Sequence, residues 1–137
     1  MMTVTPYLSF NGNCSEAMEF YKSCLGGELS IDKVGDSPMA SQMPGKENNV
    51  MHSMLKSGSI VIMASDLMME GEVKPGNNIT LTLSGGTKEE LQGYFDKLKE
   101  GGKVTHELKE EFFGTYGDLT DKYGFNWAFQ ADSVKQG

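Results

Sequence analysis

The chain has 137 residues, of which 38% are hydrophobic and 23% are charged, and its formal net charge is −7 at pH 7. This length suits one domain, or two half-domains that share a core. The acidic balance argues against nucleic acid or an anionic membrane as a partner. All 12 Lys and Arg residues are lysines, which lowers the expectation of a site that grips phosphate or carboxylate with a guanidinium fork.

The two cysteines, Cys14 and Cys24, are predicted to lie on one helix. Three helical turns separate two residues by roughly 15 Å, whereas a disulfide needs Cα atoms within about 7 Å. We therefore expect two reduced, buried thiols. The N-terminus shows no charged-then-apolar signal pattern, and no apolar run approaches the ~20 residues of a membrane span. The expected location is the cytoplasm.

The first half begins with a predicted strand and a predicted helix. Residues 4–10 alternate as a strand, with Leu8 and Phe10 on the apolar face. The segment 15–25 carries an apolar stripe at helical spacing and ends at Gly26-Gly27. A second strand is expected over 28–34, followed by a long loop over 35–48, the length of which is typical of binding loops.

A β-hairpin is predicted over residues 49–66, with Ser57-Gly58 as its turn. This turn would place Leu55 opposite Ile60 and His52 opposite Met63. Side chains alternate across a strand, so one face is aliphatic and should lie against a helix. The other face is more polar and holds His52, Met54, Val61, Met63 and Ser65.

The second half repeats this order. A loop over 66–77 leads to a strand over 79–83, and Thr87 to Glu90 form a capping box for a helix that ends at Gly101-Gly102. Further strands are expected over 103–111 and 125–131, with 114–120 leading to a turn. Trp127 is predicted to face the helix.

The two halves therefore read as two βαβββ modules, 3–66 and 78–133, joined by a linker over 67–77 in one domain of residues 1–137. The predicted fold class is α+β: a curved, mostly antiparallel eight-stranded sheet with helices outside. The face away from the helices is too polar for a core, so we interpret it as the lining of a ligand cavity. It collects Thr5, Tyr7, Ser9, His52, Met63, Asn78, Thr80, Thr82, Asn126, Ala128 and Gln130.

This order of elements resembles the vicinal-oxygen-chelate superfamily, which contains glyoxalase I, bleomycin-binding proteins and extradiol dioxygenases. Specific motifs resemble its PhnB-like branch, often labelled 3-demethylubiquinone-9 3-methyltransferase-like. They span most of the chain and comprise residues 6–17, Phe20-Tyr21, 25–28, His52, 62–66 and 120–127. The resemblance implies the two-module fold, a small-molecule ligand and a homodimer.

The resemblance also implies where metal ligands would stand, at Thr5, Met63, Asn78 and Ala128. None of these is His, Asp or Glu, and a divalent metal site needs roughly three such ligands. We therefore expect no metal. The sequence also lacks a glycine-rich strand-to-helix signature for a nucleoside cofactor, so no cofactor is expected, and the methyltransferase label does not predict the reaction.

His52 is the expected catalytic residue, an acid or base, because imidazole titrates near neutrality. The alternative is a histidine satisfied by neighbouring polar groups. Asp66 either orients His52, binds the ligand or caps a loop, whereas His106 lies among charged residues and should be exposed. Phe113 and Tyr116 either stack on a planar ligand or pack. The full set of expected ligand contacts is Tyr7, Met63, Asp66, Asn78, Thr80, Phe113, Tyr116 and Gln130.

The leading functional hypothesis is a protein that holds a small organic ligand without metal, either as a binding module or as an enzyme that uses His52. The alternative is a metal-dependent lyase or dioxygenase with a relocated metal site. A third class, an interaction scaffold, would have no enclosed cavity.

Overall fold

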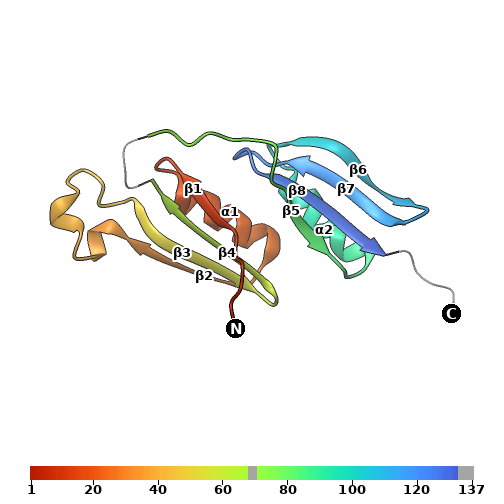
Figure 1. The fold of residues 1–137 in the computed structure, drawn as a ribbon, viewed down its shortest axis with the longest axis horizontal. Helices are drawn as coiled ribbons and strands as arrows, with labels where there is room; N and C mark the ends of the chain where they lie inside the picture. Colours follow the sequence, from red (N-terminus) through yellow and green to blue (C-terminus); the bar gives the residue numbers. More distant parts are fainter. Residues whose placement is uncertain (68–70, 133–137) are drawn as a thin grey trace. The chain divides into compact units, whose positions relative to one another are not determined.

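The structure of the protein is a computed structural model that describes residues 1–67 and 71–132 (Figure 1). The chain forms two compact units, Met1–Lys74 and Pro75–Gly137, each with the order strand, helix, three strands. The expected βαβββ module therefore occurs twice. The first unit contains β1 (Tyr7–Phe10), α1 (Cys14–Leu25), β2 (Glu28–Lys33), the 3-10 turns η1 (Val34–Asp36) and η2 (Ala40–Gln42), β3 (Val50–Ser57) and β4 (Ile60–Asp66). The second contains β5 (Leu81–Ser84), α2 (Lys88–Leu98), β6 (Lys103–Glu111), β7 (Gly114–Thr120) and β8 (Asn126–Asp132).

The N-terminal sheet has the strand order β1-β4-β3-β2, in which β1 is parallel to β4 and the other pairs are antiparallel. The helix α1 packs on one face of this sheet (Figure 1). Its apolar stripe is buried, as the helical spacing predicted. The strand residues that face it are also buried, and they are Leu8, Phe10, Ser53, Leu55, Ile62 and Ala64.

The turn of the first hairpin differs from its prediction. Ser57 pairs with Ile60, so the turn residues are Gly58 and Ser59, and Gly58 has a φ of +59°. Glycine accepts this left-handed conformation without steric cost. The pairing is shifted by two residues, so Ser53 lies opposite Ala64 rather than Ile62. Because the side-chain period of a strand is two, the faces stay as predicted.

The C-terminal sheet has the equivalent order β5-β8-β7-β6, again with one parallel pair. The helix α2 begins at the predicted capping box, in which Thr87 Oγ1 accepts from Glu90 N–H at 3.1 Å. Phe95 of α2 meets Phe129 of β8 edge to face, with ring centroids 5.2 Å apart. Trp127 is buried on the same side, as the alternation predicted.

Two strands start later than predicted. β1 begins at Tyr7 rather than residue 4, and β5 begins at Leu81 rather than residue 79. Ile79, expected to point inward, is 72% exposed. Asn126 explains this start, because its Nδ2 donates to the carbonyls of Gly76 and Ile79 at 2.8 and 3.2 Å. The Asn126 side chain therefore binds residues 76–79 in place of the strand pairing that was expected at residue 79.

The segment between the units was expected to be a linker over 67–77. Residues 68–70 of that range, and residue 133 of the expected second module, lie outside the described residues. Within the described part of the chain, neither helix is long and apolar enough to cross a membrane.

Candidate functional site: the open sheet faces

Tyr7 and His52 form an aromatic pair on the face of the N-terminal sheet opposite α1. Their ring centroids are 6.0 Å apart with the planes inclined at 52°. Tyr7 is 48% exposed, and His52 is half-buried. Met63 lies beside Tyr7 in the parallel pair and opposite Met54 in the hairpin. The structure therefore brings together three residues that the alternation placed on one face: Tyr7, His52 and Met63.

Asp66 is placed elsewhere. Its carboxylate is 1% exposed and accepts from three backbone N–H groups, those of Gly12 and Cys14 on Oδ1 at 2.8 and 3.0 Å and that of Val50 on Oδ2 at 2.8 Å. The two bonds on Oδ1 cap the N-terminus of α1, where Asn13 makes no side-chain cap, and the third ties it to the start of β3. Of the alternatives for Asp66, the geometry fits the cap rather than a ligand contact.

Cys14 and Cys24 are buried free thiols, as predicted. The pKa of the Cys14 thiol is raised from 9.0 to about 12, mainly by burial; a hydrogen bond with Ser53 opposes this shift and the nearby Asp66 charge adds to it. Cys14 Sγ lies 3.7 Å from Ser53 Oγ. At neutral pH Cys14 is therefore a thiol rather than the thiolate that nucleophilic chemistry needs.

The expected contacts in the second unit are spread along its sheet. Asn78 and Thr80 precede β5 and are exposed. Gln130 pairs with Tyr116 across β8 and β7, and its Nε2 lies 3.3 Å from Ser84 Oγ. Phe113 is 52% exposed beside the turn between β6 and β7, with its ring centroid 6.5 Å from that of Tyr116.

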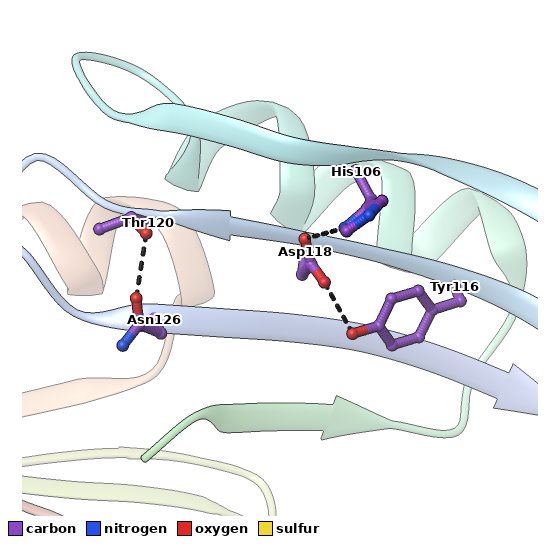
Figure 2. A network of polar contacts seen from close by, with 5 residues as sticks. All are labelled: His106, Tyr116, Asp118, Thr120 and Asn126. Atoms are coloured by element: carbon purple, nitrogen blue, oxygen red, sulfur yellow. Dashed lines mark hydrogen bonds and ion pairs between the residues drawn. The ribbon is translucent and has the colours of Figure 1, made fainter. Parts of the chain in front are cut away.

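One cluster was missed from the sequence. His106 Nδ1 and Tyr116 Oη both lie 2.8 Å from the carboxylate of Asp118, one on each oxygen (Figure 2). His106 was expected to be exposed, and its side chain is 70% exposed, but its carboxylate partner was not foreseen. The sequence did indicate one of the two contacts, because Tyr116 and Asp118 are two residues apart and therefore share a strand face. The opposing residue on β6 could not be counted, because two register shifts flank His106.

The pKa values of this cluster move in opposite directions. Burial raises the pKa of Asp118, but hydrogen bonds from His106, Tyr116 and Thr105 together outweigh it, so the pKa of this carboxyl lies below its ordinary value. The hydrogen bond to Asp118 raises the pKa of Tyr116. Asp118 is thus ionised and Tyr116 is a neutral donor at neutral pH.

The positions that the family resemblance gives to metal ligands carry a hydroxyl, a thioether, an amide and a methyl group, at Thr5, Met63, Asn78 and Ala128. These groups do not fit a divalent transition metal, which favours imidazole, thiolate and carboxylate. Among the described residues of each unit, no three His, Cys, Asp or Glu side chains gather at one place.

Comparisons with known proteins identify the family. A family model described as 3-demethylubiquinone-9 3-methyltransferase matches residues 2–130. The Escherichia coli (strain K12) protein YjdN is 32% identical over 148 residues, covering 98% of this chain and 97% of YjdN. The crystal structure of PA1353 from Pseudomonas aeruginosa is 32% identical with a TM-score of 0.86, covering 97% of this chain and 99% of that one.

Two further structures agree with this assignment. The PhnB protein from Bacillus cereus is 28% identical with a TM-score of 0.75, covering 95% of this chain and 99% of that one. A glyoxylase/bleomycin resistance protein/dioxygenase domain from Frankia sp. EAN1pec is 16% identical with a TM-score of 0.65, covering 96% and 98%, and shows the shared fold alone. The chain therefore belongs to the 3-demethylubiquinone-9 3-methyltransferase family, the PhnB-like branch of the vicinal-oxygen-chelate superfamily.

Proposed function

We propose that the protein binds a small organic molecule on the open face of its N-terminal sheet, at the Tyr7–His52 pair. The supporting observation is the 6.0 Å contact between the two rings on the face opposite α1, with Tyr7 48% exposed. An aromatic ring offers apolar contact area, and an imidazole offers a hydrogen-bond donor or acceptor. Together they suit a ligand with an apolar body and one polar group.

Met54 and Met63 extend this surface. They lie directly opposite each other on β3 and β4, and Tyr7 lies beside Met63 on β1. Methionine is flexible and polarisable, and such side chains adapt to ligands of different shape. The site therefore suits a family of related apolar molecules more than one polar metabolite.

The alternative, a metal-dependent lyase or dioxygenase, requires ligands that the expected positions do not supply. Asp66, which could have joined His52 as a ligand, is occupied by three backbone N–H groups. The observations therefore favour binding without metal.

A ligand screen by thermal shift tests the proposal with matched histidine variants. The chain has two histidines, one in each unit. A ligand at the proposed site should raise the melting temperature of wild-type protein and of His106→Gln, because binding stabilises the folded state. The shift should be lost in His52→Gln and in Tyr7→Leu.

Each contrary result has a defined meaning. A ligand shift that survives both His52→Gln and Tyr7→Leu would overturn the proposed site. Stoichiometric Ni, Zn, Fe or Mn in the purified protein, lost in His52→Gln, would replace the proposal by the metal-dependent alternative. Conversion of the bound molecule by wild-type protein but not by His52→Gln would add catalysis to binding.

We also propose that the protein is a cytoplasmic homodimer. The two buried free thiols are in keeping with a reducing compartment, and the family resemblance implies the dimer. Light scattering on the purified protein should give twice the 15.0 kDa mass of one chain. A mass of one chain would exclude the dimer.

A further inference from the structure

We propose that His106, Asp118 and Tyr116 form a second site, on the open face of the C-terminal sheet, that binds a weakly acidic organic compound and accepts its proton. His106 is the proton acceptor, and Asp118 and Tyr116 position it. All three residues belong to the C-terminal sheet, whereas Tyr7 and His52 belong to the N-terminal one. Its geometry rests on two 2.8 Å contacts to one carboxylate (Figure 2).

The tautomer of the neutral His106 ring follows from its partner. An ionised carboxylate only accepts hydrogen bonds, so the 2.8 Å contact requires a proton on Nδ1 of His106. In the neutral ring Nε2 then carries the lone pair. The side chain is 70% exposed, and Nε2 is therefore open to a ligand. The second oxygen of Asp118 is held by the Tyr116 hydroxyl, which restrains the carboxylate.

The backbone of β6 places His106 for this purpose. The register of β6 against β7 shifts on both sides of His106, and such bulges redirect a side chain. Gly117 allows the irregular strand to approach, because a Cβ there would lie 2.8 Å from the Leu108 Cα and 3.2 Å from the His106 carbonyl oxygen. The pairing of β6 with β7 is therefore irregular at the position where His106 contacts Asp118.

Two lysines on the same face of β6 as His106 favour a negatively charged product. Lys103 pairs with Thr120 and Lys109 pairs with Tyr116, and both partners lie on the same face of β7 as Asp118. Directly opposite residues share a face, so β6 presents two ammonium groups on either side of His106. The Phe113 ring, 6.5 Å from that of Tyr116, adds apolar surface for the body of the ligand.

The proton transfer is balanced within the site. The O–H bond of the ligand breaks, the proton goes to Nε2 of His106, and the electron pair stays on the ligand oxygen. The resulting imidazolium is stabilised by Asp118, and the ligand anion by Lys103 and Lys109. No oxidant, reductant or further reactant is needed.

The probe is 4-nitrophenol, the colour of which reports its ionisation, at a pH where the free compound is mostly protonated. Wild-type protein and His52→Gln should bind it with a rise in phenolate absorbance. His106→Gln should abolish the rise and weaken binding about tenfold, the value of one charge-assisted hydrogen bond. Lys103→Met and Lys109→Met should each weaken it, whereas Lys22→Met, a matched charge removal on α1, should not.

Two further measurements separate this site from a structural cross-strand contact. 4-Nitroanisole has the same ring without the acidic proton and should bind at least about tenfold more weakly. Nitrogen NMR of wild-type protein should show that the neutral His106 ring carries its proton on Nδ1. Equal binding of the two probes, unchanged absorbance in His106→Gln, or a proton on Nε2 would each overturn the proposal while leaving the Tyr7–His52 site untouched.

Discussion

The rings of Tyr7 and His52 meet across β4, the strand that lies between β1 and β3, and their centroids are 6.0 Å apart. β1 and β3 are not neighbouring strands, so this contact depends on the reach of the two ring-bearing side chains across β4. The two rings therefore cover part of β4 and form a continuous aromatic surface from β1 to β3.

The Tyr7 ring should shift the proton resonances of the His52 imidazole. In Tyr7→Leu, the imidazole proton resonances of His52 should move because the ring current of Tyr7 is removed, while those of His106 stay in place. Tyr7→Phe keeps the ring and should leave both nearly unchanged. Proton NMR of the three proteins measures this, and unmoved His52 signals in Tyr7→Leu would show that the rings are apart in solution.

Replacing Asp66 should strongly destabilise the first unit. Asp66→Asn puts an amide N–H₂ among three backbone donors that need an acceptor. We expect a loss of about 3 kcal/mol in the free energy of unfolding, because buried backbone groups lose a charged acceptor. Urea unfolding measures it, and the exposed Asp36→Asn is the control. A loss as small as that of the control would contradict the assigned cap.

The Cys14 thiol should make the protein sensitive to alkali. Its pKa in the folded state is about 12 against an ordinary 9.0, so the folded state holds the proton more tightly than the unfolded state. The stability from Cys14 is therefore complete below pH 9.0 and decreases as the pH rises toward 12. Urea unfolding at several pH values should show a smaller alkaline loss in Cys14→Ala than in wild-type protein.

A reagent test gives independent access to the same thiol. Cys14 is fully buried, so a disulfide reagent at neutral pH should modify it only as the protein opens, and rapidly in urea. Fast modification in native buffer would show that the thiol is neither buried nor protonated as described.

Two glycines of the second unit should respond to alanine in opposite directions. A Cβ at Gly102 would collide with the Thr120 carbonyl oxygen, whereas a Cβ at Gly93, within α2, would meet nothing within 4 Å. Gly102→Ala should therefore destabilise the protein by more than about 2 kcal/mol. Gly93→Ala should stabilise it by about 0.5–1 kcal/mol because helix propensity rises. Thermal unfolding compares them, and equal effects would contradict the close approach at Gly102.

The sequence was sufficient to predict which strand residues face the helices and the order of the helices and strands. Leu55 and Ile62 are buried and His52 lies on the opposite face, because period-two alternation is independent of the turn. The turn itself was wrong by one position, since Ser57-Gly58 and Gly58-Ser59 both place glycine where a tight turn accepts it. A shift of two residues in pairing does not change a face, so the predicted face of His52 was unaffected.

The His106–Asp118 contact could not be predicted in the same way. Counting residues across β6 and β7 fails, because the register changes between Val104 and His106 and again before Lys109. Bulges depend on close backbone approaches such as the one at Gly117, and these are set by packing rather than by a local pattern. Asp66 was ambiguous for a related reason, since its partners lie up to 54 positions away.

The remote cap of α1 also bears on the sequence of events during folding. The helix α2 carries its own capping box at Thr87. The N-terminal cap of α1 is instead Asp66, which lies 52 residues downstream of Cys14. A nascent chain in which Asp66 has not yet been synthesised lacks the carboxylate that caps the N-terminus of α1. We expect the C-terminal helix to form on local information, while the N-terminal one consolidates only once its distant strand has docked.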